Sequence, residues 1–142
     1  PRHILSKCRT EAKMYRILAV DDDPGMQQIL QAALQAEGYE FLLSRNGAGA
    51  LPIAIAEKPD LIILDINLPD MNGMDVCRAL KAEAKTRHIP VVMLTGEARE
   101  VVNRVEGLDI GAEDYLFKPI SPRMLVSRIK SLLKLTMKPT QP

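Results

Sequence analysis

Five side chains able to do chemistry stand at the ends of apolar runs in this sequence. They are Asp21, Asp22, Asp65, Thr95 and Lys118. Three carboxylates brought together repel one another, and their pKa values rise unless a cation neutralises them. Oxygen ligands that leave room for water suit Mg²⁺, which uses one or two carboxylates together with a phosphate. A hydroxyl and an ammonium opposite such a metal complete a clamp for a phosphoryl group, so these residue types predict phosphoryl chemistry.

The five side chains meet only if the apolar runs form parallel strands of one sheet. The run at 61–64 holds four consecutive apolar residues, two of them β-branched, which is typical of a strand buried on both faces. In a parallel sheet the carboxyl ends of all strands share one edge, where open α/β sheets place their ligands. The expected strands cover residues 15–20, 39–44, 61–64, 90–94 and 114–117.

Residues with helical spacing separate these strands. The first amphipathic helix is predicted by apolar residues at i, i+3, i+4, i+7 and i+8, namely Met26, Ile29, Leu30, Ala33 and Leu34. Asp23 before Pro24 fits the start of that helix, and Gly38 fits its end. A weaker helix is expected over 46–58, because Gly47, Gly49 and Pro52 all lower helix propensity. Further helices are expected over 74–84, around 101–108 and from 121 onward.

Strands and helices that alternate through short connections predict an α/β fold with a parallel sheet and right-handed crossovers. The natural architecture at this size is a flavodoxin-like, doubly wound (βα)5 sandwich with strand order 2-1-3-4-5. Its ligand crevice lies at the ends of strands 1 and 3, where the three aspartates are expected. We expect a domain over 14–136, a loose or non-native arm over 1–13, and a tail or linker over 137–142.

Composition narrows the class of protein. The chain has 142 residues, of which 46% are hydrophobic and 26% charged, with a net charge of +1. These values are typical of one globular domain and give no field that would attract nucleic acid or a membrane. Cys8 and Cys77 form no C-x-x-C pair, and no run is long enough to span a bilayer. We therefore expect a cytoplasmic protein.

Each residue also has a simpler structural interpretation when taken alone. Asp23, and with it Asp22, could serve merely to cap the first helix, and Asp65 could serve merely to begin a turn. Thr95 could be an ordinary hydroxyl at a strand end, and Lys118 an ordinary solvated side chain. The functional interpretation depends on all of them occurring together at strand ends.

Four segments carry a resemblance that covers residues 14–135. In order and spacing they resemble the receiver domain of two-component response regulators, chemotaxis-type regulators among them. The segments are 17–23, 60–73, 90–96 and 111–119.

The resemblance implies that Asp65 accepts a phosphoryl group from a histidine kinase or a histidine phosphotransfer protein. Asp22 would bind Mg²⁺, or Mn²⁺ in its place, directly, and Asp21 would bind it partly through water. Asp65 itself and the backbone carbonyl of Asn67 would be further ligands. Lys118 would bind a phosphoryl oxygen. Such a domain is a phosphorylation-dependent switch that assists its own phosphorylation and dephosphorylation, and it is not classed as an enzyme.

Thr95 would then hydrogen-bond the new phosphoryl group, and Tyr115 would rotate inward. These movements would change the surface formed by the helix near 101–108, the strand at 114–117 and the last helix. The partner would be a downstream effector protein or a covalently linked output domain, with no membrane contact and no direct nucleic-acid contact from this domain. Asn67 and Glu97 match the pairing of regulators that lose the phosphoryl group quickly.

A phosphorylation-dependent homodimer is a further expectation, although one departure from the family argues against its usual form. Met124 replaces the acidic residue common in the subfamily that dimerises through its last helices.

Two alternatives fit the sequence less well. A Mg²⁺-dependent phosphatase of the haloacid dehalogenase class would carry a second catalytic aspartate at the position of Asn67, and it would need a cap and a longer chain. A flavin-binding module would need a loop rich in glycine and hydroxyl groups where this chain has Asp21, Asp22 and Asp23.

Overall fold

The computed structural model describes residues 14–96 and 111–137, with side chains up to residue 134. The described strands form one parallel sheet in the order β2-β1-β3-β4-β5, which confirms the predicted topology. The strands are β1 (Arg16–Val20), β2 (Glu40–Ser44), β3 (Leu61–Asp65), β4 (Val91–Thr95) and β5 (Asp114–Phe117). The described helices are α2 (Pro24–Ala36), α3 (Ala50–Glu57), α4 (Gly73–Ala82) and α6 (Pro122–Met137).

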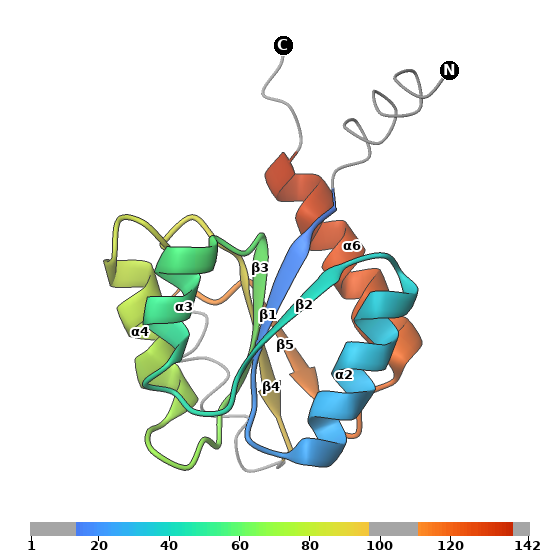
Figure 1. Cartoon of the computed structure of the whole chain (residues 1–142), viewed down its shortest axis with the longest axis horizontal. Helices are drawn as coiled ribbons and strands as arrows, with labels where there is room; N and C mark the ends of the chain where they lie inside the picture. The colour runs from blue at the N-terminus through green and yellow to red at the C-terminus, as the bar shows by residue number, and fades with distance from the viewer. Residues whose placement is uncertain (1–13, 97–110, 138–142) are drawn as a thin grey trace.

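These helices cover both faces of the sheet. Helices α2 and α6 lie together on one face, and α3 and α4 lie on the other (Figure 1). Two apolar clusters follow from this division. One cluster packs α3 and α4 against the sheet, and the other packs α2 and α6 against its opposite face. Every residue of β3 and of β4 is buried, as expected for central strands covered on both sides.

Helix α3 is shorter than predicted. It was expected from residue 46, but it begins at Ala50, with Gly49 as a helix N-cap that makes no side-chain capping bond. Pro52 therefore falls in the first helical turn, where backbone N–H groups have no partner within the helix and proline is tolerated.

Two residues of the predicted helices are exposed. Ile29 is 45% exposed, although Met26, Leu30 and Leu34 of the same predicted stripe are buried. Ala84 is exposed and follows the end of α4 at Ala82. The helix expected near 101–108 and the segment 1–13 lie outside the described residues.

Candidate functional site

The carboxyl ends of the strands bring the predicted side chains together. The register pairs Val20 with Leu64, Asp65 with Leu94, and Thr95 with Phe117, so the strand ends lie at similar heights. Each of Asp21, Asp22 and Asp65 offers one carboxylate oxygen, and these oxygens lie within 4.8 Å of one another.

The acidic groups differ in burial. Asp21 is 1% exposed and Asp65 4% exposed, whereas Asp22 is exposed. Burial raises the pKa of both Asp21 and Asp65 above the usual aspartate value, although Lys118 and backbone hydrogen bonds act in the opposite direction. The site therefore holds carboxylates whose charge is poorly compensated.

Lys118 is the cation of this site. Its Nζ lies 3.3 Å from Asp65 Oδ2 and 3.8 Å from Asp21 Oδ2. The backbone N–H of Lys118 donates to the carbonyl of Thr95 at 2.7 Å, which ties the ends of β4 and β5 together. The Lys118–Pro119 peptide bond is cis.

Two buried polar atoms at this edge have no hydrogen-bond partner among the described residues. They are Asp21 Oδ2 and Thr95 Oγ1. A buried polar group without a partner lowers the stability of the fold by about as much as the loss of a hydrogen bond, so such atoms call for an explanation. An unsatisfied carboxylate oxygen within a cluster of three carboxylates fits a divalent cation, and an unsatisfied hydroxyl beside Lys118 fits an anionic group.

Two neighbours, Gln27 and Asp23, hold Asp21 in place, and sequence reasoning missed the first of them. Gln27, one turn into α2, donates from Nε2 to the carbonyl of Asp21 at 2.8 Å. Asp23 caps α2, because its Oδ2 accepts from the N–H of Met26 at 3.1 Å, while its own N–H donates to Asp21 Oδ1 at 2.9 Å. The capping interpretation thus applies to Asp23. The contact of Gln27 could not be predicted from the sequence, because its side chain binds a backbone carbonyl and residue type does not identify such a partner.

The loop after Asp65 folds back on itself. Asn67 and Asn72 form a β-bridge, and the N–H of Gly73 donates to the carbonyl of Ile66 at 2.7 Å. The N–H of Asn67 donates to Asp65 Oδ1 at 3.2 Å. Asp22 and this loop together line a cavity of about 490 Å³ beside the carboxylates. Of the three clustered aspartates, Asp22 is the one that lines this cavity, so the cavity adjoins the cluster on its exposed side.

Asp70 joins this loop to the next one. Its carboxylate accepts from the N–H groups of Gly47 at 2.8 Å and Ala48 at 2.9 Å, just before α3. These backbone hydrogen bonds lower the pKa of Asp70. Residue types along the chain do not indicate this contact, because the partners are backbone groups more than twenty residues away.

Tyr115 points into the protein. It is 5% exposed, and its hydroxyl donates to the Sδ of Met74 at 3.2 Å. Met74 lies at the start of α4, directly after the loop that follows Asp65. Glu97, predicted to affect the lifetime of the phosphoryl group, lies outside the described residues.

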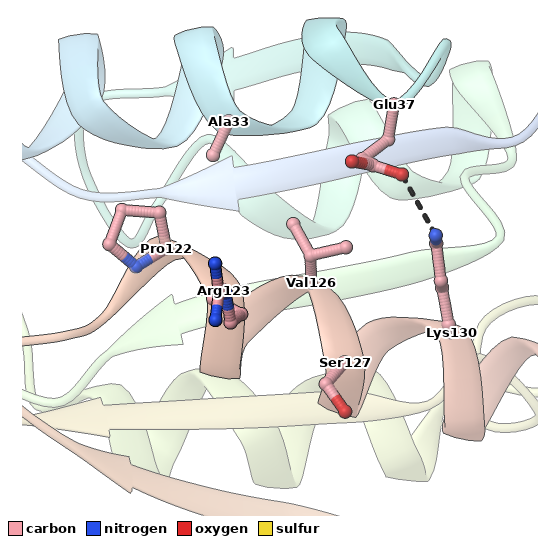
Figure 2. Close-up of a pocket in the computed structure, with 7 residues that line it drawn as sticks. All are labelled: Ala33, Glu37, Pro122, Arg123, Val126, Ser127 and Lys130. Carbon is pink, nitrogen blue, oxygen red and sulfur yellow. Dashed lines mark ion pairs between the residues drawn. The ribbon is translucent and has the colours of Figure 1, made fainter.

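A groove of about 530 Å³ between α2 and α6 is separate from this site (Figure 2). Apolar side chains of Ala33, Pro122 and Val126 line it, and Lys130 reaches across it to Glu37 at 2.9 Å. It contains none of the five predicted side chains.

No helix in the described ranges is long and apolar enough to cross a membrane.

Comparison with known proteins agrees with this geometry. Residues 17–130 match the family described as the response regulator receiver domain. The DNA-binding response regulator MtrA of Mycolicibacterium smegmatis is 43% identical over 119 residues, which are 84% of this chain and 50% of MtrA. The phosphate regulon transcriptional regulatory protein PhoB of Pseudomonas aeruginosa is 42% identical over 120 residues, which are 84% of this chain and 52% of PhoB. The chain thus spans about half the length of these two relatives.

A solved structure shares the fold. The CheY-like response regulator receiver domain protein of Methanospirillum hungatei superimposes with a TM-score of 0.83 at 32% identity, over 89% of this chain and 98% of that one. The sequence match, the sheet order and the cluster of strand-end residues lead to one conclusion. The chain belongs to the receiver domain family of two-component response regulators.

Proposed function

We propose that this domain accepts a phosphoryl group on Asp65, with Mg²⁺ or Mn²⁺ bound beside it, and that the phosphorylated form changes the surface around β5 and α6. The observation that carries the proposal is the pair of unsatisfied buried atoms, Asp21 Oδ2 and Thr95 Oγ1, on either side of the buried Asp65 carboxylate. One atom suits a cation and the other an anion.

The carboxylates of Asp21, Asp22 and Asp65 and the carbonyl of Asn67 would hold the metal. When bound, the ion would neutralise charge on the incoming phosphoryl group. The Nζ of Lys118 lies 3.3 Å from Asp65 Oδ2. Once Asp65 is phosphorylated, this ammonium group would bind an oxygen of the phosphoryl group. The Asp65 oxygen would attack phosphorus while the bond to the donor breaks, so the donor leaves with the electron pair.

The hydroxyl of Thr95 would donate to a phosphoryl oxygen, which satisfies an atom that is otherwise buried without a partner. Lys118 and Thr95 lie at the ends of β5 and β4, so their new contacts would favour one arrangement of the following loops. Tyr115, already inside the protein against Met74, would stay inward in the phosphorylated form. The output is a changed partner surface, which is why we classify the domain as a switch and not as an enzyme.

The donor would be a histidine kinase or histidine phosphotransfer protein, and the receiver of the signal an effector protein or a linked output domain. The relatives named as DNA-binding or transcriptional regulators favour an output in transcription, although this domain itself would not touch DNA. Asn67 and Glu97 lead us to expect a short-lived phosphoryl group.

Incubation with acetyl phosphate and Mg²⁺, followed by intact mass measurement, tests the proposal. We expect one added phosphoryl group in the unmodified chain and none in Asp65→Asn or in the presence of EDTA. Asp70→Asn is the matched control, because Asp70 lies in the same loop but binds backbone groups away from the carboxylates. Phosphorylation that survives Asp65→Asn, or that persists for hours after donor removal, would contradict the site or the expected lifetime respectively.

A further inference from the structure

Strand β2, one of the two edge strands of the sheet, has one side open. Strand β2 lies at the end of the sheet and pairs only with β1 among the described strands. The N–H of Glu40 donates to Tyr15, and the carbonyl of Ser44 accepts from Asp21. In a parallel ladder these bonds assign residues 40, 42 and 44 to β1, so the backbone groups of Phe41 and Leu43 face outward.

This edge lacks the features that usually keep a strand from pairing with another chain. Its sequence, Glu-Phe-Leu-Leu-Ser, contains no proline, no lysine and one charge, at its first residue. Natural edge strands are commonly protected by lysine, proline or a bulge, and an apolar open edge is a surface for strand addition.

Helix α3 beside this edge is apolar on all sides. From Ala50 to Ala56 it carries no polar side chain, and Ala48, Pro52 and Ala56 are exposed at spacings of four residues. A helix that is apolar all round is normally covered. A groove of about 420 Å³ runs between α3 and β2, with apolar walls that include Leu42, Leu43 and Ile53. The groove between α2 and α6 differs, because the Lys130–Glu37 ion pair already bridges it (Figure 2).

We propose that a second copy of this chain covers the edge, by antiparallel pairing of β2 with β2 about a two-fold axis at Leu42. The register follows from the outward groups. With Leu42 opposite Leu42 of the second copy, Phe41 faces Leu43, and each such pair exchanges both of its backbone hydrogen bonds. The arrangement uses the same surface on both copies, as a two-fold interface requires.

Charge also favours this occupant. Near the amino end of β2, the carboxylates of Glu40, Glu57 and Asp60 outnumber the cations Arg16 and Lys58 among the described residues, which leaves a net negative charge there. The carboxyl end is followed by the exposed Arg45. Antiparallel pairing places the acidic end of each copy beside Arg45 of the other, whereas parallel pairing would place like charges together.

Sedimentation equilibrium of the full chain from about 1 µM to 1 mM tests the association. We expect the mean mass to rise from 15.8 kDa toward twice that value. Ala56→Arg and Arg45→Glu alter exposed side chains and so preserve the fold, which circular dichroism checks. Each should weaken the association about tenfold or more, since each change occurs twice in the dimer.

Met124→Lys is the matched control. Met124 is 53% exposed near the opposite edge of the sheet, so this variant should associate as the unmodified chain does. A mass of 15.8 kDa at every concentration would overturn the proposal, and so would an association that Met124→Lys weakens and Ala56→Arg does not.

Amide hydrogen exchange tests the register without any substitution. The amides of Phe41 and Leu43 should exchange more slowly as concentration rises, while that of Leu42, which is bonded to β1, should be slow throughout. Exchange at Phe41 and Leu43 that does not depend on concentration would overturn the β2 pairing.

Discussion

The sheet has an amino edge, where its parallel strands begin, and a carboxyl edge, where they end. Both edges place a basic side chain among several carboxylates, but they satisfy these groups to different degrees. At the amino edge, Arg16 bonds Glu40 at 3.2 Å and Glu57 at 2.6 Å, and it also donates to the Glu57 carbonyl. Its backbone N–H donates to Asp60 Oδ2 at 2.9 Å. At the carboxyl edge, Lys118 lies near Asp65 and Asp21, while Asp21 Oδ2 and Thr95 Oγ1 find no hydrogen-bond partner within residues 14–96 and 111–137.

The difference distinguishes a structural charge network from a binding site. Arginine at the amino edge directs several donors to fixed acceptors, and the hydrogen bond to Glu57 raises its pKa. The buried carboxylates at the carboxyl edge have raised pKa values, because burial outweighs the opposing effect of Lys118. Unsatisfied groups lower stability unless a ligand completes them, so the carboxyl edge is where we expect a ligand to bind.

Substitution of Gly73 should have the largest effect on stability, and Gly38 provides the comparison. A Cβ on Gly73 would overlap the carbonyl oxygen of Asp65 and lie 2.7 Å from the Cα of Ile66. We expect Gly73→Ala to lower the free energy of unfolding by roughly 3 kcal/mol, because backbone would have to move. At the amino edge, Gly38 has φ +86° and open space around it, so Gly38→Ala should cost only about 1 kcal/mol. Urea denaturation measures both, and equal losses would remove this difference between the edges.

Removal of the amino-edge cation should destabilise the protein. We expect Arg16→Met to lower the free energy of unfolding by about 1.5 kcal/mol, because Glu40 and Glu57 lose their common partner. The Arg16 side chain is 31% exposed, so water limits the loss. Arg78→Met is the matched control, since Arg78 is 52% exposed and, within the described part of the chain, forms an ion pair with Asp75 alone. A loss no larger than that control would show that the Arg16 network is not structural.

Removal of a carboxylate from the carboxyl edge should have the opposite sign. With EDTA at pH 7, Asp21→Asn should raise the free energy of unfolding by about 1 kcal/mol, because a buried, poorly compensated charge is lost. The pKa of Asp21 is raised in the folded state, so this residue destabilises the fold increasingly as pH rises through that pKa. The gain should therefore vanish as pH falls below the pKa of the unfolded chain.

Thermal unfolding across that pH range measures the effect of Asp21→Asn, and saturating Mg²⁺ supplies the control. The metal should stabilise the unmodified chain more than the variant, because the variant has lost a ligand. If Asp21→Asn were destabilising at pH 7 without metal, the carboxyl edge would resemble the amino edge after all.

Asp70 provides the smallest effect and the exception within the carboxyl edge. Its pKa is lowered by the N–H groups of Gly47 and Ala48, so it stabilises the fold above the unfolded pKa and loses that contribution as pH falls through the folded one. Asp70→Asn should therefore lower the melting temperature slightly at pH 7 and leave it unchanged under acid conditions. A rise in melting temperature at pH 7, as expected for Asp21→Asn, would contradict the assignment of these two aspartates to different roles.

The sequence alone predicted the strands, their order and the residues at their carboxyl ends. Apolar runs mark strands and a 3.6-residue spacing marks helices, and both are local information. The strand order came instead from the architecture usual for a domain of this size, since right-handed crossovers limit the possible orders without fixing one. The start of α3 was wrong by four residues, because propensity does not locate an N-cap when glycines and a proline lie close together. The exposure of Ile29 was also missed, since a helical stripe does not reveal how far the neighbouring helix extends.

The sequence predicted that Asp23 caps α2, but only the tertiary structure decided which of the aspartates are buried and which one ties two loops together. The contacts of Asp70 with Gly47 and Ala48, and of Tyr115 with Met74, join segments far apart in the chain. Their partners are backbone N–H groups or a thioether, which residue type does not single out. The difference between the two edges likewise depends on distances and burial. The sequence determined where acidic residues stand along the chain, and the packing of the chain determined which of their charges are satisfied.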